Sequence, residues 1–315
     1  MTAEAFDPLP DQPIVPPRGA PVARLTTPGV HAGTFRFEGN DLAYEVYGEG
    51  DRLLVYLHGL LLDAEVNRGI AEALARRGNR VVLLDLLGHG RSDHPEHASL
   101  YRIDLYAHQV FALLDHLGAD QAVLGGVSLG ANVSLQAAVQ APERVRGLVL
   151  EMPALEWAVP SAAVLFVPLV LALHYAKPVA TVLTRLVRSL PRTPFSPLNS
   201  MLNAASLPPE RIAAVLHGIL VGPTAPAVEE RRTLTVPTLV LGHRNDLIHP
   251  LNDATNLVRE LPNAHLVRAR SPLELRLWPD RLTGEMADFL ADVWSVDEAA
   301  SSGRPSGRAP KGRRS

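Results

Sequence analysis

The 315-residue chain is 47% hydrophobic, carries a formal net charge of −3 and contains no cysteine. This length and apolar content suffice for a large buried core, whereas the lack of cysteine excludes disulfides, thiolate catalysis and cysteine-ligated metals. Without a basic surplus, the composition favours a small, mostly uncharged partner over nucleic acid. We see no secretion signal, so we expect a cytoplasmic protein. No metal or organic cofactor is implied.

The two ends of the chain lack the pattern of a packed element. Residues 1–30 are rich in proline and show little periodicity, and residues 295–315 are small, polar and basic. Such compositions do not bury enough apolar surface to fold. We therefore predict a disordered arm at the N-terminus and a disordered basic tail at the C-terminus.

The elements predicted between these ends alternate between strand and helix. Residues 33–48 (GTFRFEGNDLAYEVYG) predict a β-hairpin, because apolar and polar residues alternate on both sides of a turn signal. Continuous apolar strands follow, separated by helical stretches, which indicates an α/β fold with a mostly parallel sheet covered on both faces. Chemistry in such sheets lies at the carboxyl ends of the strands. The strands are predicted at RLLVYLHG, RVVLLDL, QAVLGGVS, VRGLVLEMP and PTLVLGHRND.

Residues 153–234 interrupt this alternation and predict an inserted helical cap, which leaves 31–152 and 235–294 as the core. Within the cap, residues 157–176 (WAVPSAAVLFVPLVLALHYA) carry no charge and are long enough to span a bilayer. Pro160 and Pro168 interrupt this segment, and the later strands must rejoin the same sheet. We therefore favour a lid helix that lines an apolar pocket over a membrane span. Peripheral contact with a membrane surface is a third interpretation.

A candidate nucleophile follows the strand QAVLGG. Residues 126–130 (GVSLG) match G-x-S-x-G, and a tight strand-to-helix turn there would present the hydroxyl of Ser128 above the sheet. The backbone N–H groups of Leu129 and Leu60 are candidates for an oxyanion hole, since both follow the ends of strands. A serine that only caps the helix is the alternative.

The motifs LHG, DLLGHGRSD, GGVSLG and PTLVLGHRND, in this order, resemble those of the α/β-hydrolase family over about residues 33–293. The resemblance implies the α/β-hydrolase fold, a serine nucleophile at Ser128 and a triad acid at Asp246. Epoxide hydrolases and dehalogenases would be expected to carry aspartate in place of Ser128. Hydrolysis of carboxylic esters with a hydrophobic acyl or alcohol part is therefore favoured.

The resemblance also predicts a histidine after the last strand, near residues 271–273, where the chain has none. The last histidine, His265, begins that strand and would lie about 13 Å from its catalytic end. His249, on the same loop as Asp246, is the candidate base that we select. Its alternative role is to cap the helix that begins near Pro250.

Three other groups remain as alternative bases: His174 and His217 from the cap, and Glu151 after a core strand. If none of these groups serves, the protein is a catalytically silent relative that binds a hydrophobic ligand under its cap. The sequence thus leaves two functions open, an esterase-like serine hydrolase and a binding protein.

Overall fold

The computed structural model describes residues 30–244, 246 and 248–301, with side chains described up to residue 295. The predicted disordered ends lie mostly outside the described residues. Where they overlap, the structure corrects the predicted boundary, because the last helix continues to Ser301. The sequence VDEAAS at its end contains glutamate and alanine, which favour helix.

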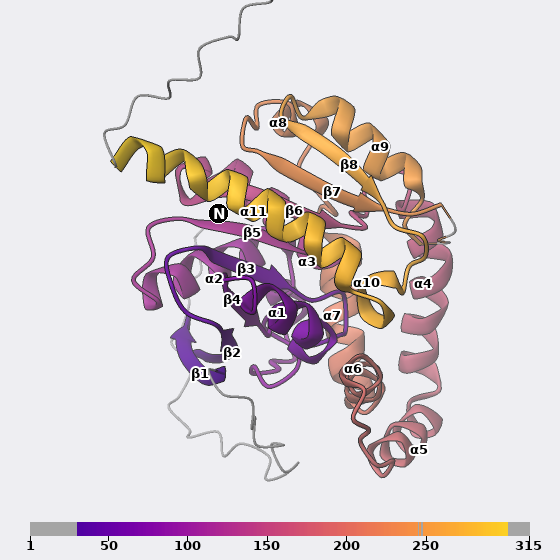
Figure 1. Cartoon of the computed structure of the whole chain (residues 1–315). Helices are drawn as coiled ribbons and strands as arrows, with labels where there is room; N and C mark the ends of the chain where they lie inside the picture. Colours follow the sequence, from indigo (N-terminus) through magenta and orange to yellow (C-terminus); the bar gives the residue numbers. More distant parts are fainter. Residues whose placement is uncertain (1–29, 245, 247, 302–315) are drawn as a thin grey trace, which may run out of the picture.

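An eight-stranded sheet forms the centre of the protein (Figure 1). Its strand order is β1-β2-β4-β3-β5-β6-β7-β8. The hairpin β1-β2 is antiparallel and joins β4 antiparallel, whereas all other neighbouring strands pair parallel, as predicted. The strands are β1 Val30–Phe37, β2 Asn40–Tyr47, β3 Leu53–Leu57, β4 Arg80–Leu84, β5 Ala122–Val127, β6 Val145–Glu151, β7 Thr238–Gly242 and β8 Ala264–Arg268.

Helices cover both faces of the sheet. Along β3, Leu54 and Tyr56 pack into the apolar core under α1 and α11, whereas Val55 and Leu57 pack into the core under α2, α3 and α9. Because both faces are buried, the parallel strands are continuous apolar runs. These helices are α1 Arg68–Ala75, α2 Ile103–His116, α3 Leu129–Gln140, α9 Leu251–Glu260, α10 Glu274–Leu277 and α11 Asp280–Ser301, with 3-10 turns η1 Ala64–Asn67, η2 Ala98–Leu100 and η3 Pro142–Arg144.

Five helices lie between β6 and β7, in the segment predicted to be an inserted cap. Figure 1 shows α4 to α6 along one edge of the molecule, away from the sheet. Within the described residues, no single helix has the length and apolar composition to cross a membrane. Only α4 and α5 taken together have that length and composition, and they meet at a bend of 103°. The inserted helices are α4 Val159–Tyr175, α5 Lys177–Arg188, α6 Ser196–Ala205, α7 Pro209–Val221 and α8 Val228–Arg231.

The apolar segment predicted to line a pocket is α4, and here the structure differs. Leu173 is the one residue of this helix that is buried, and most of its other large apolar side chains face solvent. An uncharged run of residues indicates burial only where another part of the fold covers it, and α7 covers just one side of α4.

Candidate active site

Ser128 lies on a sharp turn between β5 and α3. Its backbone has φ 55° and ψ −110°, a conformation that non-glycine residues rarely adopt. The turn is held from β6, because the Ser128 N–H donates to the carbonyl of Glu151 at 2.8 Å. Close packing explains the flanking glycines: a Cβ on Gly126 or Gly130 would lie 2.6 or 2.7 Å from the carbonyl oxygen of Leu57. The predicted strand-to-helix elbow is therefore present.

His249 lies within hydrogen-bond reach of this serine, and Asp246 lies within hydrogen-bond reach of His249. The distance from Ser128 Oγ to His249 Nε2 is 2.7 Å, and that from His249 Nδ1 to Asp246 Oδ2 is 2.9 Å. Because a carboxylate only accepts, Nδ1 carries the proton of the neutral imidazole and Nε2 accepts from the serine hydroxyl. The three residues thus form a continuous Ser-His-Asp chain, although 121 residues separate the serine from the histidine.

Asp246 receives hydrogen bonds at both carboxylate oxygens. Its Oδ1 accepts from the backbone N–H groups of Ile248 and His249, at 2.8 and 3.2 Å, and Oδ2 lies 3.3 Å from His243 Nε2. Burial alone would raise the pKa of Asp246, but the bonds from His243, His249 and Ile248 outweigh burial and hold this pKa well below its usual range. The carboxylate therefore stays ionised and orients the His249 ring.

His243 is a site residue that the sequence reasoning missed. It follows β7, is buried, and its Nε2 lies 2.9 Å from Met152 Sδ as well as near Asp246. The available signal was its position three residues before Asp246 in the motif GHRND.

The candidate oxyanion donors follow neighbouring strands. Leu57 of β3 pairs with Gly126 of β5. Leu60 lies three residues after Leu57, and Leu129 lies three residues after Gly126. Leu60 is a central residue of a turn closed by a 3.1 Å bond from Leu62 N to Gly59 O, and the N–H of such a residue is not used within the turn. Leu129 is the first residue of α3, where backbone N–H groups have no helical partner. Both donors therefore belong to the rim that carries Ser128.

Two histidines near this rim have structural roles. His58 is fully buried and accepts from the Leu86 N–H at 3.0 Å, while burial lowers its pKa and keeps it neutral. His89 is also buried, with Nδ1 3.0 Å from the carbonyl of Leu87. Both stabilise the loop that follows β4.

The alternative bases do not reach Ser128 in the structure. His174 and His217 are exposed on α4 and α7, and His265 lies in the first half of β8. The carboxylate of Glu151 is occupied, because it accepts two bonds of 3.0 Å from Arg276 and one of 2.8 Å from the hydroxyl of Tyr56. The proposal of Glu151 as a base is therefore contradicted by its ion pair.

The loop in which the family usually carries its histidine does lie close to the site. Ser271 lines a small hollow together with Met152, His243 and Glu151. This loop carries no imidazole, and the imidazole that contacts Ser128 comes instead from the loop after β7.

Apolar side chains of the inserted helices pack over the Leu60 turn. Leu173 of α4, with Ile212 and Leu216 of α7, forms a small core that Leu60 and Leu61 also contact. The neighbourhood of the candidate oxyanion donors is therefore apolar, which suits a substrate with a hydrophobic part.

Asp253 on α9 joins the inserted helices to the loop that carries His249. Its buried carboxylate accepts the backbone N–H groups of Leu155, Trp157 and Ala158 at 2.8, 3.0 and 3.0 Å. The residues leading into α4 are thus fixed to a helix that begins two residues after His249. Sequence reasoning did not find this contact, because its partners are about a hundred residues apart.

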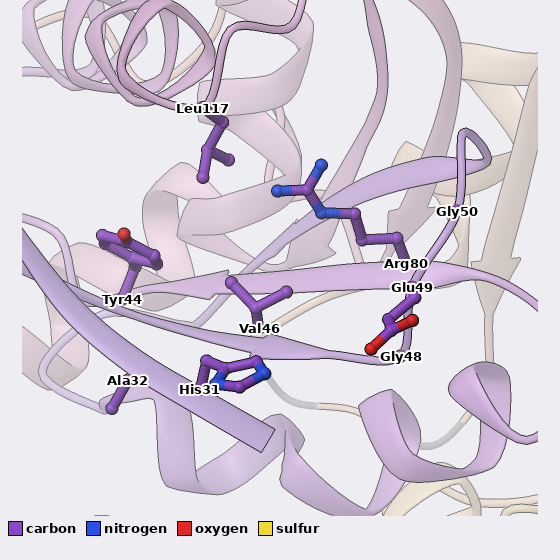
Figure 2. A pocket seen from close by; sticks show the side chains of 9 residues that line it. All are labelled: His31, Ala32, Tyr44, Val46, Gly48, Glu49, Gly50, Arg80 and Leu117. Carbon is purple, nitrogen blue, oxygen red and sulfur yellow. The ribbon is translucent and has the colours of Figure 1, made fainter. Parts of the chain in front are cut away.

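A second hollow, of about 380 Å³, lies at the opposite rim of the sheet (Figure 2). It is lined by His31, Tyr44, Gly48–Gly50 and Arg80, where β4 begins rather than ends. It is therefore separate from the Ser128 rim. No group of three His, Asp or Glu side chains within the described residues is arranged to hold a metal ion.

The fold, the elbow and the three-residue chain together define an α/β hydrolase. The chain belongs to the alpha/beta hydrolase fold family, whose profile matches residues 52–271. Among curated proteins, it is 39% identical over 110 residues to a pimeloyl-[acyl-carrier protein] methyl ester esterase of Salmonella heidelberg. It is 42% identical over 111 residues to the dihydrolipoyllysine-residue acetyltransferase component of an acetoin cleaving system of Pseudomonas putida.

These local matches cover 35% and 34% of this chain, and 40% and 28% of the two relatives. The chain thus spans less than half the length of either relative. Among solved structures, the enol-lactonase of Burkholderia xenovorans LB400 superposes with a TM-score of 0.66 at 22% identity, covering 82% of this chain and all of that one. This likeness supports the fold.

Proposed function

We propose that the protein hydrolyses carboxylic esters that carry a hydrophobic acyl or alcohol part, with Ser128 as nucleophile. The Ser128–His249–Asp246 chain, with contacts of 2.7 and 2.9 Å, is the observation that carries this proposal. The family membership and the similarity to a methyl ester esterase support ester hydrolysis in general.

The geometry suits acyl transfer in two halves. In the first, Ser128 Oγ attacks the ester carbonyl as His249 Nε2 takes its proton, and the N–H groups of Leu60 and Leu129 stabilise the oxyanion. Collapse of the tetrahedral intermediate expels the alcohol, which receives the proton from Nε2 and leaves an acyl ester on Ser128. In the second half, Nε2 takes a proton from water, the hydroxide attacks the acyl carbonyl, and the acid leaves as Oγ regains its proton. Asp246 holds the imidazole in the required tautomer throughout.

The experiment pairs covalent labelling with turnover. The purified protein is treated with a fluorophosphonate probe, the labelled peptide is identified by mass spectrometry, and p-nitrophenyl esters of increasing chain length are assayed alongside Ser128→Ala. We expect labelling at Ser128 and turnover that is lost in the variant, with longer acyl chains preferred. A folded protein with neither labelling nor turnover would contradict the proposal and favour the silent ligand-binding protein.

A further inference from the structure

We propose that the outer side of α4 and α5 docks onto the surface of an anionic lipid bilayer. We call this the outer surface and define it by ten exposed apolar side chains on these helices and just beyond them. They are Val164, Leu165, Val167, Leu171 and Tyr175 of α4, Val179, Val182, Leu183 and Leu186 of α5, and Leu190 just beyond α5.

The outer surface exposes large apolar side chains to water. Val164 and Tyr175 are 77% and 80% exposed, and Val182 and Leu186 are 62% and 61% exposed. On α5 the apolar positions recur at intervals of three and four residues, so they form one stripe along the helix. Clusters of large exposed apolar side chains mark surfaces that bind a membrane or another protein.

The charges on and beside α5 favour an anionic partner for the outer surface. No aspartate or glutamate occurs between Glu156 and Glu210, whereas Lys177, Arg185, Arg188 and Arg192 lie on or beside α5. Lys177 lies 3.6 Å from Glu210, but Arg188 and Arg192 donate hydrogen bonds to neutral groups on Ser206, Asn203 and Leu190.

Arg185 forms no ion pair with any of the described residues. The chain as a whole is negatively charged, so this positive segment is set apart from it. Uncompensated cations beside an apolar stripe complement anionic headgroups over an acyl layer.

The shape of the outer surface also favours a bilayer over a second copy of the chain. α7 packs against both α4 and α5 and so covers their inner side, while the two helices meet at 103° and form an L along the edge of the molecule (Figure 1). A symmetric dimer through this face would bring together two positive segments, neither of which has a carboxylate between Glu156 and Glu210 to pair with the other's cations.

The test measures binding to vesicles in the Ser128→Ala background, so that no lipid ester can be hydrolysed through Ser128 during the assay. The full chain is mixed with vesicles of phosphatidylcholine alone, or of phosphatidylcholine and phosphatidylglycerol in equal parts, and bound protein is measured by flotation. Three further proteins are tested in the same way. One carries the double substitution Leu183→Gln and Leu186→Gln, the second carries Arg185→Gln, and the third carries Arg76→Gln. Arg76 is exposed at the end of α1, away from the outer surface, and serves as the matched control.

We expect binding to the anionic vesicles that weakens as salt is raised. Removing one cation should weaken this binding about fivefold, and the double leucine variant should weaken it at least about tenfold, whereas Arg76→Gln should leave it unchanged. Circular dichroism confirms that each variant is folded. No binding to anionic vesicles, or binding that the leucine and arginine variants leave unchanged, would overturn the proposal. A concentration-dependent dimer that the leucine changes abolish would also overturn it and assign the surface to a second copy.

Docking does not depend on the proposed reaction, because none of the residues tested touches Ser128. Failure of vesicle binding would therefore leave the esterase proposal standing, and failure of ester turnover would leave the docking proposal standing.

Discussion

Replacement of His249 by alanine should remove most of the activity. The imidazole lies 2.7 Å from the serine oxygen and 2.9 Å from the carboxylate, so the substitution removes both the proton acceptor and its link to Asp246. Loss of a positioned general base costs about 10² to 10⁴ in rate, and at the upper limit this equals about 5 kcal/mol of transition-state stabilisation.

The assay follows kcat and KM for p-nitrophenyl butyrate in the wild type, His249→Ala, Ser128→Ala and the double variant. Groups that act as one unit are not additive, so the double variant should lose no more activity than the worse single variant. His217→Ala, at an exposed imidazole on α7, is the matched control and should keep wild-type kcat. Full activity of His249→Ala, or a large loss in His217→Ala, would refute the assignment of the base.

Other substitutions test the supporting structure. Asp246→Asn should lower kcat about 10⁴-fold through the wrong imidazole tautomer. The fold depresses the pKa of Asp246, whereas in the unfolded chain the pKa of an aspartate is about 3.9. The charge of Asp246 therefore stabilises the protein at pH values above about 3.9. As the pH falls below about 3.9, the difference in Tm between wild type and variant should shrink. Gly130→Ala would place a Cβ 2.7 Å from Leu57 and should cost about 1 to 3 kcal/mol in urea unfolding; an unchanged midpoint would contradict the close packing at the elbow. Asp253→Ala leaves three N–H groups without their acceptor and should speed proteolysis between β6 and α4, while equal cleavage rates would argue against this anchor.

The fold could be predicted because its signals are local. Each buried parallel strand is a continuous apolar run, and the glycines around Ser128 mark the one turn at which β5 and α3 approach β3 closely. The same local signals place Ser128, Leu60 and Asp246 at the carboxyl rim of the sheet, since strand ends in a parallel sheet meet there.

The remaining site features depend on contacts between distant residues. His249 was one candidate among several, because the direction of its ring follows from a turn in which Asp246 accepts two backbone N–H groups. The pairing of Glu151 with Arg276 joins residues 125 positions apart and could not be predicted from either. For the same reason the uncharged sequence of α4 predicted burial, although the elements that contact this helix leave only Leu173 buried.

A crystal structure of the phosphonylated protein would test most directly whether the general base comes from the loop after β7. We expect phosphorus bonded to Ser128 Oγ, His249 Nε2 within hydrogen-bond distance of the adduct, and a phosphoryl oxygen directed at the N–H groups of Leu60 and Leu129. An adduct on Ser128 with His249 turned away, and another imidazole or a carboxylate in its place, would contradict it.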